Sequence, residues 1–295
     1  MQNKIDIMKD KLLTKLPKEG VLNSTLKGVE LFRIDDPFKK RPQLYNPQII
    51  ILAQGKKNIY LGDNTYFYDR DHYYVQTVPL SVECEAIIEK DKPMVGLTIT
   101  IDPQIIGEIL FDMDIKPPKT STILNSLYDA PTSDSVIDAA IRLIDVIGNK
   151  NETRVLGPLY VKEIIFKILS GENGEILREL AVNNRGFYQI SRIINNIHEN
   201  YSKPFEVQEL ASEAGMSATA FHSAFRAITS TSPLQYIKNI RLYKAKEMIQ
   251  TEGEKANVAA IRVGYESPSQ FSREYKRFFG TTPAKDKNNV ALYAQ

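Results

Sequence analysis

Two short segments close to the C-terminal end of the chain carry polar and cationic side chains at helical spacing. The second of them places Ser269, Gln270 and Arg273 on one helical face, with Lys276 and Arg277 about one turn further on. Arg and Gln are the side chains that most often pair with guanine and adenine in the major groove, and Lys and Arg neutralise phosphates. This pattern predicts a helix that binds double-stranded DNA.

The first segment has a less distinctive set of side chains. With its aromatic residues turned inward, its outward positions are Thr219, His222, Ser223 and Arg226. An ordinary solvated helix face explains this set nearly as well as DNA binding does. The same explanation is weaker for the second segment, because three cations lie there within a turn and a half beside a single acid, Glu274.

Both segments belong to an internal repeat that covers residues 211–233 and again 260–283. Each copy has an Ala, a Gly four residues later, a Ser soon after the Gly, two aromatic residues four positions apart, and a closing Pro. Gly suits the positive φ just past a helix, Ser caps the next helix, and the aromatic pair anchors that helix to a core. A helix, a tight turn and a second helix anchored to a core make a helix-turn-helix motif. Two such motifs with matching spacing strongly favour DNA binding. The matched residues are Gly215 and Gly264, Ser217 and Ser267, Phe221 and Phe271, and Phe225 and Tyr275.

A further helix is predicted before each pair, over residues 188–200 and 234–250. The two units are therefore trihelical, and the helix over 234–250 is a rod that joins them. Residues 187–295 carry 14 Lys and Arg against 10 Asp and Glu, a net charge of +4, whereas the whole chain has +2. This mild positive bias is typical of a domain that faces phosphates.

Residues 20–101 have the pattern of β structure. Short runs of aromatic and β-branched residues, such as 49–52, 58–61 and 65–68, are separated by Gly, Asn and Asp. This spacing predicts a meander or a small barrel.

Helical signatures follow the β region. Asp102 can cap a helix over 103–110, and apolar residues at helical spacing predict two more helices, over 136–147 and 158–169. These two amphipathic helices can pack on the β region or on a second subunit, and both arrangements stay open.

The C-terminal region resembles the AraC/XylS family of transcription regulators from about residue 187 to 287. Its most specific match is the run 269–280, Ser-Gln-Phe-Ser-Arg-Glu-Tyr-Lys-Arg-Phe-Phe-Gly, and 214–217, 232–236 and 264–267 match as well. The resemblance implies that the second helix of each unit is a reading helix, one that enters the major groove of DNA. One chain then contacts two grooves roughly 34 Å apart.

Carried onto this sequence, the resemblance assigns base reading to Thr219, His222 and Ser223 in the first helix, and to Ser269, Gln270 and Arg273 in the second. The first reading helix departs from the family pattern, in which a larger residue often stands in place of Thr219.

The N-terminal region resembles the cupin-like barrel of one branch of this family through residues 45–57 and 61–63. The predicted fold is multidomain α+β: a cupin-like β-barrel for sensing or dimerisation at 1–125, a helical dimerisation or linker segment at 126–184, and an all-α AraC-type DNA-binding domain at 187–288. Its helix-turn-helix motifs lie at about 207–228 and 257–280, joined by the rod helix.

The resemblance implies a bacterial, sequence-specific DNA-binding regulator that forms a homodimer. A small-molecule effector of the barrel is a further candidate partner, and so is RNA polymerase if the protein activates transcription. The chain has 42% hydrophobic residues, no apolar run near the roughly 20 residues that span a bilayer, and a charged start without the apolar core of a signal peptide. We therefore expect a cytoplasmic protein without membrane contact.

The alternative function is a cupin-type metalloenzyme fused to a helical domain. Such a site needs two or three His and a carboxylate on the barrel wall. This region holds only His72, preceded by Asp71, while His198 and His222 lie far away and Cys84 is alone. We expect no catalytic residues, no metal and no cofactor.

Three alternatives within the β region remain open. Cys84 can be a redox or electrophile sensor, although a lone Cys in a strand is more often buried and inert. A purely architectural or dimerisation domain without a ligand is also compatible with the sequence. A group of aromatic residues can line a ligand cavity, although such residues more often fill a core: Tyr60, Tyr66, Phe67, Tyr68, Tyr73 and Tyr74.

Overall fold

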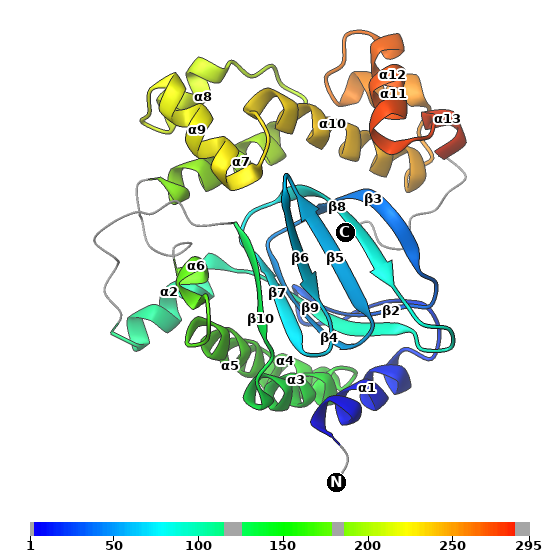
Figure 1. The fold of residues 1–295 in the computed structure, drawn as a ribbon, viewed down its shortest axis with the longest axis vertical. Helices are drawn as coiled ribbons and strands as arrows, with labels where there is room; N and C mark the ends of the chain where they lie inside the picture. The colour runs from blue at the N-terminus through cyan, green and yellow to red at the C-terminus, as the bar shows by residue number, and fades with distance from the viewer. Residues whose placement is uncertain (1–2, 115–125, 179–185, 287–295) are drawn as a thin grey trace.

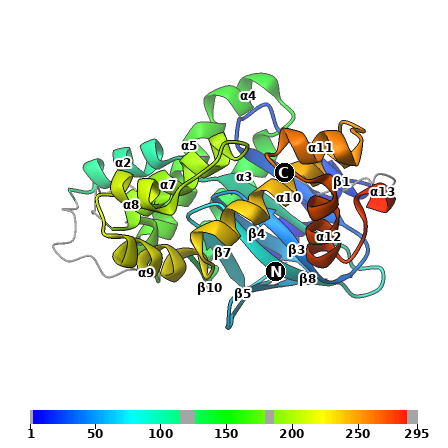
Figure 2. The ribbon, with the colours of Figure 1, turned by 90° about the horizontal axis from the view of Figure 1, so that it is seen from above.

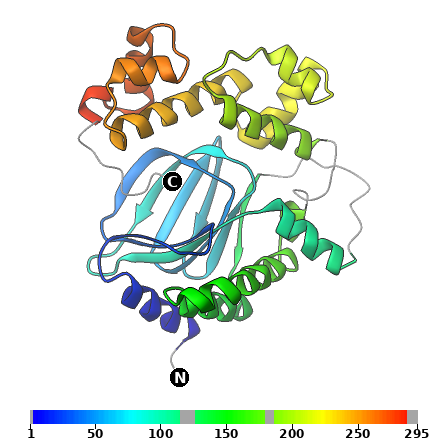
Figure 3. The same ribbon diagram turned by 180° about the vertical axis from the view of Figure 1, so that it is seen from behind.

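The computed structural model describes residues 3–114, 126–178 and 186–286. Residues 1–2 and 115–125 of the expected barrel domain, 179–184 of the expected helical segment and 287–288 of the expected DNA-binding domain lie outside the described residues. Figures 1 and 3 show a helical domain along one side of a β domain and a group of helices along the opposite side. The predicted combination of an N-terminal β domain with a C-terminal all-α domain is confirmed.

Two antiparallel sheets build the β domain. The six-stranded sheet has the order β1-β2-β9-β4-β7-β10, and the four-stranded sheet has the order β3-β8-β5-β6. Strand pairing does not join the two sheets in the described part of the chain, so closure into a barrel stays a prediction. The strands are β1 Gly20–Asn23, β2 Val29–Ile34, β3 Phe38–Tyr45, β4 Gln48–Gln54, β5 Lys56–Leu61, β6 Asn64–Tyr68, β7 His72–Gln76, β8 Leu80–Ile87, β9 Met94–Thr100 and β10 Leu127–Pro131.

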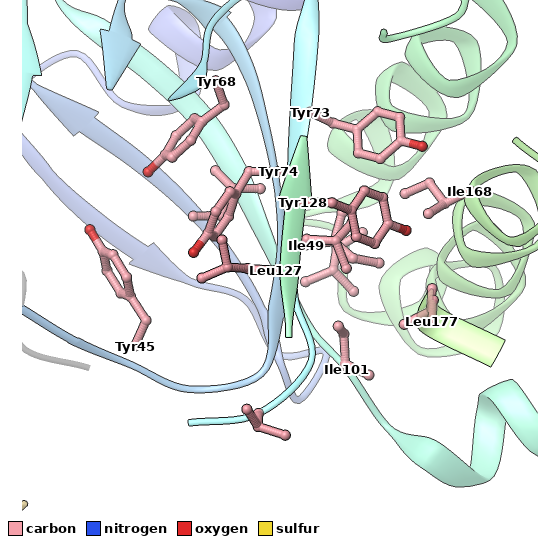
Figure 4. Close-up of a cluster of buried hydrophobic side chains, with 14 of the residues drawn as sticks. Tyr45, Ile49, Tyr68, Tyr73, Tyr74, Ile101, Leu127, Tyr128, Ile168 and Leu177 are labelled. Carbon is pink, nitrogen blue, oxygen red and sulfur yellow. The ribbon is translucent and has the colours of Figure 1, made fainter. Parts of the chain in front are cut away.

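The core of the β domain lies on both faces of the six-stranded sheet. Figure 4 shows Tyr45, Tyr68 and Tyr74 on one side of strand β7, between the sheets, and Tyr73 and Tyr128 on the other side, against helices. Alternate residues of a strand point to opposite faces, so neighbours such as Tyr73 and Tyr74 enter different layers. Of the six aromatic residues with an open role, the three at 68, 73 and 74 are buried core, and the three at 60, 66 and 67 are half-buried.

Helices cover the outer face of the six-stranded sheet. Helix α1 packs on α3 and on strands β4 and β9 through Ile5, Met8 and Leu12, which recur one turn apart. Ser133 caps α3 by accepting from the Val136 amide. The helices of this layer and its neighbours are α1 Lys4–Lys15, α2 Pro103–Asp112, α3 Asp134–Val146, α4 Lys150–Val155, α5 Gly157–Leu169 and α6 Gly174–Arg178.

The C-terminal domain consists of two three-helix units joined by the rod helix α10. Seen from above in Figure 2, α8 and α9 lie toward one end of α10, and α11 and α12 lie toward the other. The helices are α7 Phe187–Asn200, α8 Val207–Glu213, α9 Ala218–Thr229, α10 Pro233–Gln250, α11 Ala256–Arg262, α12 Pro268–Phe279 and α13 Pro283–Asp286. Both predicted helix-turn-helix motifs and the rod are therefore present.

The helical domain is packed directly on the β domain. The Tyr236 hydroxyl donates to the Pro79 carbonyl at 2.7 Å, and the Ser81 hydroxyl donates to the Tyr243 hydroxyl at 3.3 Å. The Ser126 hydroxyl donates to the Ile228 carbonyl at the end of α9. One continuous hydrophobic core runs from the β domain into the first three-helix unit, so the two domains share buried surface.

Candidate nucleic-acid interface

The turn of the first helix-turn-helix follows from its sequence. Gly215 ends α8 with a φ of 65°, the left-handed conformation in which Gly is least strained. Ser217 then caps α9 by accepting from the Ala220 amide at 3.3 Å. Phe221 and Phe225 are fully buried, with ring centroids 5.5 Å apart, and fix α9 to the unit's core. These contacts leave the opposite face of α9 toward solvent.

The second helix-turn-helix repeats this construction. Gly264 has a φ of 87°, and a Cβ atom there would lie only 2.5 Å from the Ser202 carbonyl oxygen, so no larger residue fits. Ser267 caps α12 by accepting from the Gln270 amide at 3.3 Å. Phe271 and Tyr275 are fully buried, with ring centroids 5.4 Å apart. The repeat in the sequence is thus a repeat in space.

All nine predicted site residues are exposed and lie on α9 or α12, away from the buried aromatic pairs. The face of each reading helix that was predicted to be outward is therefore outward in the structure. The nine residues are Thr219, His222, Ser223 and Arg226 on α9, and Ser269, Gln270, Arg273, Lys276 and Arg277 on α12.

The cations of α12 are not used to hold the fold. Over residues 3–114, 126–178 and 186–286, none of Arg273, Lys276 and Arg277 takes part in an ion pair or a side-chain hydrogen bond. Arg273 therefore does not pair with its neighbours Glu274 or Glu266, which would have been the structural explanation for it. Three solvated cations remain on one exposed helix face.

Glu274 orients the neighbouring Gln270, a role that the sequence did not reveal. Its carboxylate accepts from Gln270 Nε2 at 3.1 Å and from the Tyr265 hydroxyl at 2.8 Å, and Lys238 Nζ lies 3.8 Å away. Burial alone would raise the pKa of Glu274, but the hydrogen bonds from Gln270 and Tyr265 bring it below its ordinary value. A carboxylate only accepts, so the Gln270 amide must turn its nitrogen toward it.

A half-buried histidine lies where the first unit meets the rod and the β domain. His198 Nε2 is 2.8 Å from the hydroxyl of Tyr236, the same hydroxyl that donates to Pro79. Burial and, to a lesser degree, the nearby Lys244 lower the pKa of His198 to about 4. His198 is therefore neutral near pH 7.

The two β-domain side chains considered for metal binding or redox sensing, His72 and Cys84, each lie beside another polar side chain. His72 lies 3.1 Å from Asp69 through Nδ1, and Cys84 is fully buried with the Tyr45 hydroxyl 3.7 Å away. The described ranges contain no group of three or more His, Cys, Asp or Glu residues that could hold a metal ion. No helix within these ranges is long and apolar enough to cross a membrane.

A β domain followed by two helix-turn-helix units on a rod defines a DNA-binding transcription regulator. The family model for the AraC-type transcriptional regulator N-terminus matches residues 25–176, and a helix-turn-helix domain model matches residues 210–289. The chain belongs to the AraC family of transcriptional regulators. The family model at residues 25–176 and relatives such as VirF are those of transcriptional regulators, which gives no support to the metalloenzyme alternative.

Similar proteins cover different parts of the chain. The activator RclR of Escherichia coli is 33% identical over 36% of this chain, and the first relatives are matched over only 31–38% of their own length. The virulence activator VirF of Yersinia enterocolitica is 23% identical over 80% of this chain and 87% of its own. ToxT of Vibrio cholerae has the same fold, with a TM-score of 0.63 over 91% of this chain and all of its own, at 9% identity.

Proposed function

We propose that this regulator reads DNA with α9 and α12 placed in two successive major grooves. The observation that carries the proposal is the repeated motif whose second copy presents three solvated cations and an oriented amide on one helix face. Successive grooves on one side of DNA lie roughly 34 Å apart, which suits two reading helices on a common rod. The operator is then asymmetric for each chain, and such a protein works in the cytoplasm.

Selection of bound DNA from a random pool, followed by footprinting, tests this proposal. We expect a selected site with two blocks of conserved base pairs about one helical turn apart, both protected by a single chain. Protection of only one groove per chain would show that the two units do not bind together.

We propose that residues 187–288 supply the DNA contacts and that the preceding residues mediate dimerisation and sensing. Apolar side chains of α3 are buried, but α5 exposes Leu159 and Phe166 to 59% and 43%, and α2 exposes Phe111 to 88%. Around them, Lys162 faces Glu108 and Asp112 at 3.6 and 3.1 Å. An exposed apolar patch of this kind supports a two-fold dimer, in which the same patch of both copies meets.

Light scattering of the Leu159→Glu/Phe166→Glu double variant tests the dimer. We expect a dimer for the unmodified chain and a 33.5 kDa species for the variant. Ile87→Glu is the matched control, because Ile87 is 48% exposed but lies on β8, away from this patch. A monomer for the unmodified chain at micromolar concentration, with and without DNA, would refute the homodimer.

A sensing role for the β domain has independent support. One structure of ToxT contains an unsaturated fatty acid, so a chain of this architecture is able to hold a small molecule. In the present chain, a cavity of about 400 Å³ lies at one end of the six-stranded sheet. RNA polymerase is a further partner if the protein activates transcription, and reporter assays with the selected operator distinguish activation from repression.

A further inference from the structure

The hydrophobic core of the helical domain is divided along the rod α10. Apolar side chains of its first half, as far as Ile240, belong to the core that the first unit shares with the β domain. Those of its second half, from Leu242 onward, belong to a separate core in the second unit. Parts of a chain with separate cores move relative to each other unless other contacts hold them. Arg241 lies at the boundary between the two cores.

The guanidinium group of Arg241 binds backbone carbonyls from both units. Nε donates to Tyr201 and Nη2 donates to Lys203, each at 2.8 Å, in the loop that follows α7 of the first unit. Nη1 donates to Gly264 at 3.2 Å, in the turn of the second helix-turn-helix. We call Arg241 and these three carbonyls the clamp. Because the N–H groups of a guanidinium form a rigid planar fork, one side chain fixes the three acceptors relative to one another.

The loop after α7 also touches the turn of the second helix-turn-helix directly. A Cβ atom at Gly264 would lie 2.5 Å from the Ser202 carbonyl oxygen and 3.3 Å from Cζ of Arg241. The half-buried Tyr201 packs against the apolar side chains of both cores. The first unit is therefore connected to the second in two ways, covalently through the rod and non-covalently through this loop.

The turn held by the clamp determines where the second reading helix begins. Gly264 precedes the cap Ser267 by three residues, and Gln270 and Arg273 lie in the first half of α12. A displaced turn therefore displaces these side chains relative to α9. One base pair of B-DNA moves the next groove position by roughly 3.4 Å and turns it by about 35°. Reading two blocks at one fixed spacing requires the two helices to be held to better than this.

We propose that Arg241 is a positioning residue, which fixes the distance and angle between α9 and α12 and so makes the protein select the number of base pairs between the two blocks of its operator. This inference rests on the proposed DNA-reading function. Without the clamp, each helix still reads its own block, but the second unit tilts on the rod and operators of several spacings are accepted. The change falls on spacing and not on base preference.

Fluorescence anisotropy of the full chain on operators with one base pair inserted or deleted between the blocks tests the clamp. The unmodified chain should bind both altered operators about tenfold less tightly than the selected one, a loss of the size that one mismatched base pair causes. Arg241→Met keeps the apolar stem without the fork and should bring this ratio close to one, with the base preference inside each block unchanged. Arg192→Met makes the same change at an exposed position of α7 and should keep the spacing preference.

A second variant and a measurement without DNA separate the clamp from charge and from DNA binding. Arg241→Lys keeps the cation, but a single ammonium group does not reproduce the fork, so it should relax the spacing preference as well. Spin labels at Glu209→Cys on α8 and Asn257→Cys on α11, both exposed positions, report the distance between the units. Cys84, the natural cysteine, is fully buried. The distance distribution should broaden when Arg241→Lys is added.

An unchanged spacing preference in both Arg241 variants, or an unchanged distance distribution, would overturn the clamp. Specific binding by the unmodified chain that is equal at all three spacings would overturn it too, and so would an equal loss of spacing preference in Arg192→Met. If Arg241→Met does not fold, Arg241→Lys provides the same comparison. Loss of all sequence-specific DNA binding by the unmodified chain would refute the DNA-reading function, whereas the distance distribution still decides whether Arg241 holds the two units together.

Discussion

The first reading helix, α9, is hydrogen-bonded to the β domain, whereas in the described part of the chain no hydrogen bond joins α11 or α12 to it. The rod α10, which is the first helix of the second unit, is hydrogen-bonded to the β domain through both Tyr236 and Tyr243. Ile228 at the end of α9 accepts from Ser126, and Tyr236 at the start of the rod donates to Pro79. The polar contacts of α12 stay within its own unit, as those from Gln270 and Tyr265 to Glu274 do.

The reading helices of the two units also differ in the side chains that they expose. The face of α9 offers small neutral side chains, Thr219 and Ser223, with one cation, Arg226, further along. The face of α12 offers an oriented Gln270 and three cations. We infer a division of labour in which the second unit supplies most of the base readout and the first unit couples DNA binding to the state of the β domain.

The largest expected effect concerns the junction of the first unit with the β domain. The pKa of His198 is about 4 in the folded chain, below the ordinary 6.5, because partial burial and the nearby Lys244 disfavour the charged imidazolium. As the pH falls below about 6.5, His198 takes up a proton in the unfolded chain but stays neutral in the folded chain. The contribution of the neutral histidine to the free energy of unfolding is therefore complete above pH 6.5 and is lost as the pH falls toward 4. The resulting loss in the free energy of unfolding is roughly 3 kcal/mol at pH 4.

Urea unfolding at pH 7.5, 6 and 5 measures this loss. His198→Gln should flatten the pH dependence, because Gln keeps a hydrogen-bonding group near Tyr236 but does not titrate in this range. His222→Gln is the control, since His222 is exposed on α9. Equal pH dependence for the unmodified chain and His198→Gln would mean that this junction is not the acid-sensitive part of the fold.

The next largest effect tests base reading by the second unit. Arg273→Ala should cost ~1–3 kcal/mol of operator binding and relax the preference at one or two base pairs. Arg226→Ala on the first reading helix is the matched comparison and should cost less. The measurement is binding to a panel of operator variants, with thermal melting alongside. A marked fall in melting temperature with an unchanged order of preference would assign Arg273 to the fold instead.

A somewhat smaller effect concerns the orientation of Gln270. Glu274→Gln should reduce discrimination at the base pair read by Gln270 by about 1 kcal/mol, because a neutral amide no longer forces the nitrogen of Gln270 inward. Gln270→Ala should abolish that discrimination, and adding Glu274→Gln to it should change nothing more. Tyr265→Phe removes only the other hydrogen bond to Glu274 and should lower stability without altering preference. Additive losses in the double variant would contradict this orientation.

Lys276 is expected to contact phosphate and therefore to act without sequence preference. Lys276→Ala should weaken binding to all DNA sequences alike and lower the slope of log K against log salt by about one. Titrations at several salt concentrations on operator and unrelated DNA measure this. A loss confined to the operator would show that Lys276 reads a base.

The smallest effects are expected on the first reading helix. Thr219→Ala and Ser223→Ala should each change operator affinity by about 0.5 kcal/mol or less, as exposed small side chains commonly do. The same operator panel gives the comparison with Arg273→Ala. Losses as large as that of Arg273→Ala would show that both units read bases equally and would remove the division of labour.

The sequence by itself determined the helical domain and the outward faces of its reading helices. Gly215, Ser217, Phe221 and their counterparts in the second unit act within a few residues of their own position, so spacing alone revealed turn, cap and buried face. The same holds for Asp102, whose side chain caps α2. Local hydrogen bonds and helical periodicity carry this information along the chain.

Only the tertiary structure decided features that join distant residues. Strand β10 is a five-residue segment that pairs with β7 about fifty positions earlier, and α1 has its apolar side chains buried by α3 and by β4 and β9. The solvation of Arg273 and the contact of the half-buried His198 with Tyr236 likewise depend on neighbours brought together by folding. Burial and hydrogen-bond satisfaction are properties of the packed chain, and no short-range pattern of residue types encodes them.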